Sequence, residues 1–413
     1  MMKIENVICT GCSLLCDDVD VEVDGNVITK TWGACSHGNA RFKGLNENRP
    51  KSALANGLEV DIDKSVELLI KKLRSAKKPL IYGGECSSNR VIELCLELAE
   101  KLNAVYDAPP SICRVMTPIQ RSFEVKDLSF TEILNAADFI LYWGASVADT
   151  HLRHASKYTV MPRGIAAKMG RESRIVAMID VRESASMKIA QHKVVVEPCR
   201  DSELAKAIRE ALDGRAPSTS LEFARQVFLL VSDLKRAFFT AMFVGDSVLR
   251  CENYEESVKE IVKLAKRLCE EGICSLHPLA ESLNSYGQAK VTYTKLGLCD
   301  PYDFKVKERT KSAYDLISRG SVDFVLAVNS DIVAQTSPQL AISLKGKLAC
   351  TTELKSLTQY YSSIAIPVAA LGIEAGGKVT RTDGVDVELR PFMKAREGLI
   401  SEEELISRLI NSV

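Results

Sequence analysis

The hydrophobic pattern of the chain alternates between segments with a helical period and short, unbroken apolar runs. Apolar residues recur every three to four positions over 65–75 and again over 91–102, which predicts helices with one buried face. Between them, Lys78–Gly84 is a short apolar run that ends in two glycines, and this predicts a buried strand. A strand, a glycine turn and a helix in that order are half of a βαβ unit. The pattern therefore predicts an α/β protein.

Similar apolar runs continue along the chain. They cover 139–146, 174–182, 193–198, 241–245, 273–278, 323–329 and 347–352, with helices expected over 202–212, 221–239 and 255–271. Short strands over 364–368 and 378–389 and a helix over 402–410 follow. Near the start, apolar residues alternate on both sides of Asp24-Gly25, which is a β-hairpin signal.

These segments predict a small cap and two Rossmann-like βα domains. The cap covers 1–50 and is rejoined by 360–395. One Rossmann-like domain is discontinuous, over 51–125 and 220–358, and the other is inserted over 126–219, with a turn-rich boundary at Asp213–Thr219. Residues 396–413 form a C-terminal helix.

The strongest chemical signal is the cysteine run of the cap. Cys9, Cys12 and Cys16 are separated by two and three residues, and Cys35 follows the hairpin. Such spacing is typical of a loop that wraps an iron–sulfur cluster, with a distant cysteine as the fourth ligand. Zinc is the alternative, although zinc sites more often use two Cys-x-x-Cys pairs. Because no secretory signal precedes the run, we do not expect a disulfide framework.

Composition limits the classes of partner and the cellular compartment that we expect for this protein. The 413 residues include 54 basic and 54 acidic side chains, so the net charge of zero favours neither nucleic acid nor an acidic membrane surface. No apolar run reaches the ~18–20 residues of a membrane-spanning helix. The 13 cysteines, an odd number, favour a reducing cytoplasm in which some thiols bind metal.

Several strand ends carry residues that suit a nucleotide. Glycine allows backbone to approach phosphate, and an acid at the end of the next strand can bind ribose hydroxyls or base nitrogens. The candidate cofactor-binding residues are Gly83, Gly84, Gly144, Ser146, Asp149, Asp180, Arg182 and Asn329. Because no Gly-x-Gly-x-x-Gly occurs, a plain nicotinamide site is disfavoured.

A separate candidate is the proline-rich stretch over 107–121. Prolines precede and follow Cys113, so we expect a rigid loop that displays one thiol beside Arg114. The neighbouring guanidinium favours the thiolate, which is the form that binds metal or attacks substrate. A buried structural cysteine is the alternative.

The order of these features resembles the molybdopterin-guanine-dinucleotide oxidoreductases, and in particular the B subunit of tungsten or molybdenum formylmethanofuran dehydrogenase. The opening Cys9–Asp18 is very similar to the start of that family. Trp143–Asp149 and Asp180–Ser184 resemble its nucleotide-binding turns. Glu374–Asp383 resembles its closing segment, and this adds two cofactor-binding candidates, Arg381 and Asp383.

The resemblance implies specific cofactors and a reaction. It implies a 4Fe-4S cluster on the four cap cysteines, two molybdopterin guanine dinucleotides, and tungsten or molybdenum bound by Cys113. The implied reaction is the two-electron reduction of carbon dioxide to formate, the first step of methanogenesis from carbon dioxide, or its reverse. In this reaction the cluster relays electrons one at a time.

The resemblance also implies a fold and a set of partners. The implied fold is that of the DMSO reductases without their C-terminal β-barrel domain, so that a small subunit would cover the pterins. A formyl-transferring hydrolase-like subunit and polyferredoxin or ferredoxin subunits would complete a hetero-oligomeric complex.

Two positions depart from the family pattern. The family usually has histidine directly after the ligating cysteine, where this chain has Arg114. It also has arginine where this chain has Ala280, if Asn284–Gly287 is the family's Asn-x-x-Gly stretch. Arginine is a poor proton donor but can hold a carboxylate, and His277 is a candidate substitute donor. A divergent enzyme with another substrate and a non-catalytic electron-relay subunit are therefore the alternatives.

Overall fold

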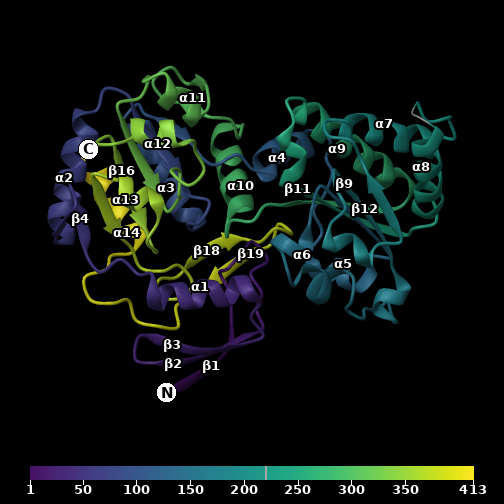
Figure 1. Ribbon diagram of the computed structural model, residues 1–413, viewed down its shortest axis with the longest axis horizontal. Coiled ribbons are helices and arrows are strands. Elements are labelled where there is room, and N and C mark those ends of the chain that lie inside the picture. The colour runs from purple at the N-terminus through teal and green to yellow at the C-terminus, as the bar shows by residue number, and fades with distance from the viewer. Residues whose placement is uncertain (219–220) are drawn as a thin grey trace. The chain divides into compact units, whose positions relative to one another are not determined.

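The computed structural model describes residues 1–218 and 221–413, which form two compact units. Unit 1 comprises Met1–Pro110, Ser282–Thr380 and Asp386–Val413. Unit 2 comprises Ser111–Glu281 and Arg381–Val385. Figure 1 shows their helices and strands. The predicted boundary between residues 219 and 220 lies outside the described residues.

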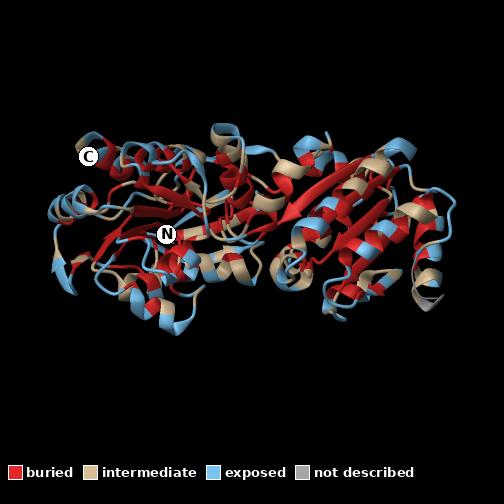
Figure 2. Cartoon of the chain, turned by 90° about the horizontal axis from the view of Figure 1, so that it is seen from above, coloured by how far each residue is buried: buried red, intermediate tan, exposed pale blue. Residues whose placement is uncertain are grey.

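Unit 1 is built on a mixed sheet of nine strands in the order β14-β13-β7-β6-β15-β16-β17-β4-β5. The five central strands are parallel and the flanking ones antiparallel. The strands are β4 (Ala53–Ala55), β5 (Leu58–Val60), β6 (Pro79–Gly83), β7 (Val105–Asp107), β13 (Tyr302–Asp303), β14 (Glu308–Arg309), β15 (Phe324–Val328), β16 (Leu348–Thr352) and β17 (Ile364–Pro367). Figure 2 shows the central strands as buried, which explains their continuous apolar runs.

Alternate residues of the central strands face opposite layers of helices. Ile81 and Leu326 pack with α2 (Ile62–Ser75), α3 (Asn89–Lys101) and α14 (Glu402–Ser412). Leu80 and Val325 pack with α11 (Ala313–Ser318) and α12 (Pro338–Ser343) on the other face. The unit also contains α10 (Ser285–Leu296) and α13 (Leu357–Tyr361). These layers make unit 1 a doubly wound α/β fold.

The cap of unit 1 is a three-stranded antiparallel sheet followed by a helix. Its elements are β1 (Met2–Val7), β2 (Val19–Asp24), β3 (Val27–Trp32) and α1 (Ser36–Glu47). The pairing of Asp24 with Val27 confirms the predicted hairpin. Leu15, from the cysteine loop, packs with Leu371 and Leu389, which belong to the segment that we expected to return to the cap. A separate two-stranded sheet, β18 (Gly377–Thr380) and β19 (Asp386–Leu389), belongs to this segment, whereas β17 joins the large sheet instead.

Unit 2 is built on a five-stranded parallel sheet in the order β10-β9-β8-β11-β12. Its strands are β8 (Phe139–Trp143), β9 (Ile175–Asp180), β10 (His192–Val195), β11 (Phe239–Gly245) and β12 (Ile273–Leu279). Because β11 and β12 pair beside β8 and α8 (Leu221–Leu234) belongs to the same unit, the prediction that 220–358 continues the first domain is wrong for 221–281. The predicted end of the first segment at residue 125 is also too late, since unit 2 begins at Ser111.

The helices of unit 2 include one that corrects the expected loop around Cys113. They are α4 (Ile112–Ser122), α5 (Phe130–Ala136), α6 (Val147–Thr150), α7 (Asp201–Leu212), α8 (Leu221–Leu234) and α9 (Tyr254–Glu271), with a π-helix over His154–Thr159 and short 3-10 turns over Gly170–Ser173, Ala185–Ile189 and Asp246–Arg250. Cys113 lies in the first turn of α4, because Pro109 and Pro110 end the preceding segment and the helix tolerates Pro118. Among the described residues, no helix has the length and apolar character needed to cross a bilayer.

Candidate cofactor sites

The four cap cysteines come together in the loop between β1 and β2 and at the start of α1. The amide of Cys9 donates to the carbonyl of Cys16 over 2.8 Å, which closes the loop on itself. Cys35 is the residue that precedes α1, and its carbonyl accepts from the amide of Asn39. A side chain at Gly38 would meet the sulfur of Cys9 at 2.8 Å, so a glycine is required where the helix approaches the loop.

The four thiols lie close together, and those of Cys9 and Cys12 are poorly solvated. Burial raises the pKa of Cys9 to about 11 and that of Cys12 to about 12, and the nearby thiols of Cys16 and Cys35 add to both rises. The thiols of Cys9 and Cys12 are therefore unfavourable as bare thiolates, but an iron–sulfur cluster supplies the positive charge that would stabilise them. The donor set therefore fits the predicted cluster.

Within the part of the chain that the structure describes, no three His, Cys, Asp or Glu side chains are grouped so that they could hold one ion. In a four-iron cluster each cysteine binds a different iron atom, so the four thiols need not converge on one point.

The predicted residues of unit 1 lie where its sheet changes winding direction. The connections from β6 lead outward to β7, and those from β15 lead outward to β16, so the carboxyl ends of β6 and β15 flank a switch point. Gly83 ends β6 with a φ of 108°, and a side chain there would meet Ser330 at 2.6 Å. Asn329 follows β15 and donates to the carbonyl of Cys86 and to Glu353. The structure therefore brings Gly83, Gly84 and Asn329 together.

A cavity of about 300 Å³ opens beside these residues within unit 1. Its lining is acidic and includes Glu353, Glu374 and Glu402. Of these, only Glu374 was noted from the sequence, as the start of the segment that resembles the family's closing segment. Glu353 forms an ion pair with Arg41, and Glu374 forms one with Arg49. Burial raises the pKa of Glu402 to about 7, although the hydroxyls of Ser87 and Thr351 both donate to it. Because Glu353 and Glu402 lie far apart in the sequence and outside that segment, no local motif identifies them.

The predicted residues of unit 2 also converge at a switch point, between β8 and β11. Gly144 follows β8 with a φ of 59°, and the hydroxyl of Ser247, which follows β11, donates to its carbonyl over 2.9 Å. Ser146 donates to Asp149 over 2.6 Å. Arg182 lies 4.0 Å from the same carboxylate, and both side chains are exposed. An exposed acid and base beside a glycine turn can bind a nucleotide.

Asp180 completes this edge of unit 2 with neighbours that the sequence did not reveal. One oxygen of Asp180 accepts from the amide of Val181 over 2.8 Å and lies 3.5 Å from the hydroxyl of Ser247. Asp201, at the start of α7, accepts from the indole nitrogen of Trp143, and burial raises its pKa. The sequence does contain a signal for Ser247. It follows β11, which ends in Gly245, just as Ser146 follows β8 and Gly144.

Cys113 is held in a buried part of unit 2. Its side chain is only 1% exposed, at the second position of α4. The carboxylate of Asp246 accepts from the amide of Ile112 over 2.7 Å and so caps the helix that carries Cys113. Burial raises the pKa of Asp246 to about 6. Arg114 is partly buried, and its amide donates to the carbonyl of Ser111. Cys113 belongs to unit 2 and the four cap cysteines to unit 1.

His277 is enclosed in unit 2 rather than displayed at a surface. It is fully buried in β12 and stacks on Phe243, with ring centroids 5.1 Å apart. Burial lowers its pKa to about 4, so the imidazole is neutral near pH 7. His154 packs on the edge of the same ring. A buried neutral imidazole cannot donate a proton readily, and the structure therefore disfavours the catalytic role expected for His277.

Arg381 and Asp383 bind each other within unit 2. Two parallel hydrogen bonds of 2.8 Å join the guanidinium to the carboxylate, and Asp383 also accepts from the amide of Phe130. The guanidinium of Arg381 lies over the rings of Phe130 and Tyr158. These contacts give both residues a structural role in attaching segment 381–385. Their binding of a cofactor stays a prediction.

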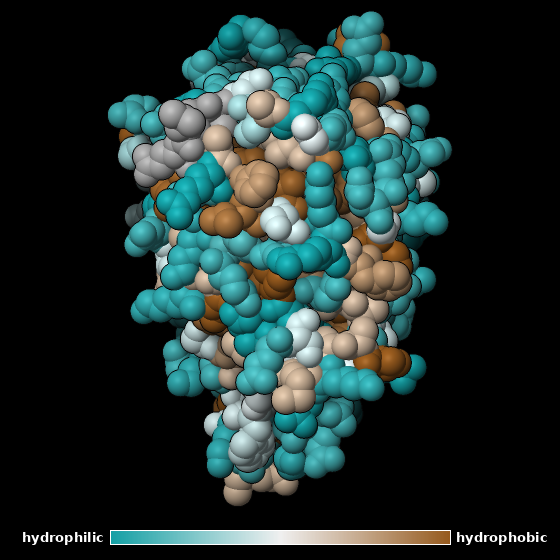
Figure 3. Space-filling model, turned by 90° about the vertical axis from the view of Figure 1, so that its right-hand side faces the viewer, coloured by the Kyte–Doolittle hydropathy of each residue, from teal (hydrophilic) through white to brown (hydrophobic). Residues whose placement is uncertain are grey.

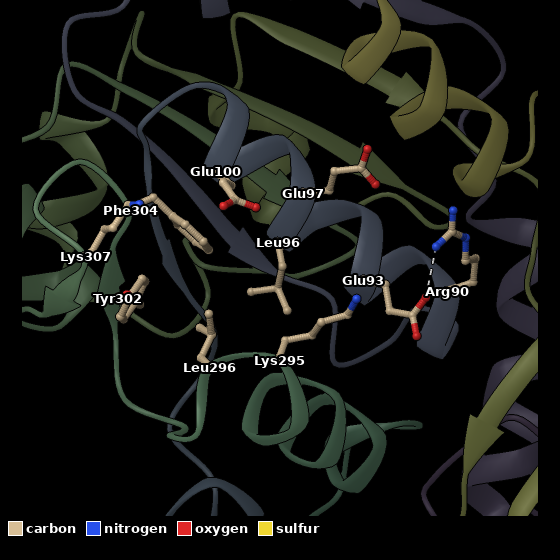
Figure 4. A pocket seen from close by; sticks show the side chains of 10 residues that line it. All are labelled: Arg90, Glu93, Leu96, Glu97, Glu100, Lys295, Leu296, Tyr302, Phe304 and Lys307. Atoms are coloured by element: carbon tan, nitrogen blue, oxygen red, sulfur yellow. Dashed lines mark hydrogen bonds and ion pairs between the residues drawn. The ribbon is translucent and has the colours of Figure 1, made fainter.

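A larger groove in unit 1 contains none of the predicted residues. It has a volume of about 410 Å³ and lies between α3 and α10 (Figure 4). Leu96, Leu296 and Phe304 supply its apolar part, and charged side chains such as Glu97 and Lys295 surround it. On the face of the molecule shown in Figure 3, hydrophobic side chains form small groups among hydrophilic ones, in agreement with the balanced charge of the sequence.

Comparison with known sequences identifies full-length relatives, although no protein-family model matches the chain. The B subunit of the tungsten-containing formylmethanofuran dehydrogenase 2 from Methanococcus maripaludis is 29% identical over 433 residues. The corresponding protein from Methanocaldococcus jannaschii is 29% identical over 440 residues. Both matches cover 100% of this chain and 99% of the relative. They confirm the resemblance predicted from the motifs.

Solved structures show a similar fold. A chain of the formyltransferase/hydrolase complex FhcABCD from Methylorubrum extorquens, crystallised with methylofuran, matches with a TM-score of 0.68 and 17% identity. This match covers 87% of our chain and 98% of that one. Acetylene hydratase from Pelobacter acetylenicus matches with a TM-score of 0.71 and 12% identity, over 99% of our chain and 69% of the hydratase. The α/β fold of this chain is therefore like that of acetylene hydratase and of the matching chain of the formyltransferase/hydrolase complex.

Proposed function

We propose that this homologue of the formylmethanofuran dehydrogenase B subunit is the redox subunit of such a complex and reduces carbon dioxide to formate, or catalyses the reverse reaction. The observation that carries the proposal is the set of four cap thiols, which gather between the β1–β2 loop and the start of α1 in a chain with full-length similarity to these subunits. The proposed location is the cytoplasm. The proposed partners are a formyl-transferring hydrolase-like subunit, a small pterin-covering subunit and ferredoxin-type subunits.

Each group of residues has a part in the proposal. Cys9, Cys12, Cys16 and Cys35 would hold a 4Fe-4S cluster, and Cys113 would bind tungsten or molybdenum. The crevice around Gly83 and Asn329 in unit 1 and the one around Gly144 and Asp180 in unit 2 would each hold one molybdopterin guanine dinucleotide. When bound, these groups would supply single-electron relay and a two-electron redox centre.

Other side chains of this protein position Cys113 and shape its surroundings. Asp246 fixes the first turn of α4 through the amide of Ile112 and thereby positions Cys113. Arg114 remains charged at every physiological pH, so it can hold the carboxylate of formate but cannot donate a proton. Its neighbour Cys113 is almost fully buried, which limits the access of water to the thiol. The chain therefore supplies a water-poor thiol with a permanent cation as the next residue of the helix.

The decisive experiment is elemental and pterin analysis of the purified complex, with formate and formylmethanofuran activity measured in parallel. We expect iron together with tungsten or molybdenum, and Cys113→Ala should lose the heavy metal and the activity but retain iron. Cys95→Ala, a buried cysteine on α3, is the matched control and should retain both. Absence of both heavy metals from the active complex would refute the proposal.

A second candidate function follows from Arg114, which stands where the family has histidine. A divergent enzyme would bind the same cofactors but act on a different substrate. This alternative predicts normal metal and pterin content without carbon dioxide or formate turnover, even after Arg114→His and Ala280→Arg. A non-catalytic electron-relay subunit would instead leave complex activity intact in Cys113→Ala.

A further inference from the structure

Unit 2 contains one feature that the cofactor proposal does not use, a disulfide between Cys199 and Cys251 with Cα atoms 5.3 Å apart. The bond was not expected, because the sequence favours a reducing compartment. In such compartments, disulfides are usually transient, catalytic or redox-sensing rather than structural. The location of the bond therefore matters more than its contribution to stability.

The bond joins two loops that leave the carboxyl edge of the sheet. Cys199 lies in the loop from β10 to α7, and Cys251 lies in the loop from β11 to α9. The ends of β9 and β8 lie between these two strands. The covalent path from one loop to the other therefore runs past Asp180 and Gly144, the residues that end β9 and follow β8.

Each loop is hydrogen-bonded to this edge a few residues before its cysteine. The amide of Val196 donates to the carbonyl of Asp180 over 3.0 Å. The hydroxyl of Ser247 donates to the carbonyl of Gly144 over 2.9 Å. Two residues after Cys251, the side-chain amide of Asn253 donates to the carbonyl of Cys199. The two arms, 196–199 and 247–251, thus begin at the proposed nucleotide crevice and end at the disulfide.

The disulfide is accessible to solvent, and the backbone of Cys199 has an unfavourable conformation. Cys199 is exposed and Cys251 is partly exposed, so a thiol reductant can reach them. Cys199 has a φ of 69°, a left-handed conformation that is rare for residues other than glycine. Without the bond, the first arm can leave this unfavourable conformation.

We propose that the Cys199–Cys251 disulfide is a redox-operated strap that retains a guanine-nucleotide-containing cofactor at the carboxyl edge of unit 2; this inference rests on the proposed function. A dithiol reductant opens the strap by thiol–disulfide exchange. One of its thiolates attacks a strap sulfur, and its second thiolate resolves the mixed disulfide. The strap gains two electrons and two protons and becomes two cysteine thiols, while the reductant becomes a disulfide.

The test uses the purified complex without and with dithiothreitol. Alkylation followed by mass measurement of this chain should show two more modified cysteines after reduction, mapped to Cys199 and Cys251. The loss of extractable pterin during repeated gel filtration should be roughly tenfold or more slower in the oxidised complex, because closed arms limit release. Under both conditions, Cys199→Ser should lose pterin as fast as the dithiothreitol-treated wild-type complex does. Cys269→Ser, on α9 outside the bond, should behave as wild type.

The possible failures are distinguishable. Equal pterin loss from the oxidised and reduced wild-type complex overturns the strap while the proposed function stands. A complex in which reduction exposes no additional thiols at these two positions also overturns it. Absence of pterin from every preparation instead refutes the proposed function, and the strap proposal falls with it because there is no cofactor to retain.

Discussion

Glu402 makes the stability of unit 1 depend on pH in a predictable direction. Burial raises its pKa from an ordinary value of 4.5 to about 7, so the folded chain favours the neutral carboxyl group. The unfolded chain ionises near 4.5 instead. Stability is therefore highest below that pH and falls as the pH rises to about 7, and above this value the loss is constant.

The magnitude follows from the same two values. A pKa difference of about 2.5 corresponds to about 3 kcal/mol, at about 1.4 kcal/mol for each pH unit. Glu402→Gln keeps the shape and the contacts with Ser87 and Thr351 but cannot ionise. We expect this variant to be about 3 kcal/mol more stable than wild type at pH 8 and less than about 1 kcal/mol more stable at pH 5.

Hydrogen exchange of peptides from β16 and α14 at several pH values, corrected for intrinsic exchange, measures this difference where it arises. Glu403→Gln is the matched control, since its side chain is exposed one residue further along the helix. This control should change protection by less than about 0.5 kcal/mol at any pH. If the gap between Glu402→Gln and wild type does not widen from pH 5 to pH 8, then Glu402 is not buried as an acid and the reasoning fails.

Three further predictions test the two units separately. Reduction of the Cys199 disulfide, whose partners are 52 residues apart, should lower the unfolding free energy of unit 2 by about 4 kcal/mol, measured by urea unfolding with and without reductant; an unchanged midpoint would contradict this. Cys16→Ser should deplete cluster iron and its visible absorbance, whereas the same change at Cys95 should leave the iron content unaltered. Gly245→Ala should cost about 1–3 kcal/mol in thermal unfolding, because its methyl group would collide with the backbone at the end of β8. Gly44→Ala, inside α1 with only ordinary contacts, should be neutral or stabilising; equal losses at both glycines would refute the packing argument.

Local sequence signals predicted the parts of the fold whose cause is local. The hairpin at Asp24-Gly25 needs only alternation and a turn, and it forms as expected. Buried parallel strands read as unbroken apolar runs, so β6, β8, β9 and β15 were all anticipated. The glycines Gly83 and Gly144 were singled out because they end such strands, and both lie at switch points.

The location of Cys113 shows where local reasoning stops. Flanking prolines predict a loop, yet the residue lies in a helix whose first amide is satisfied by Asp246, a side chain more than a hundred residues away. A cap supplied from another element leaves no trace near residue 113. The same holds for Glu402, whose hydroxyl partners come from β16 and from the loop before α3.

The misassigned segment 221–281 has a deeper cause, because strand order in a parallel sheet is not encoded by the strands themselves. Every fully buried parallel strand carries the same apolar pattern, so β11 could pair equally well beside β6 or β8 on pattern alone. The decision depends on Gly245, which lets the end of β11 approach the backbone at Gly144 more closely than any side chain would permit. Ser247 then donates to the carbonyl of Gly144 across the same junction. A pair of glycine-ended strands that contact each other is therefore a sharper predictor of a switch point, and of a ligand crevice, than either glycine alone.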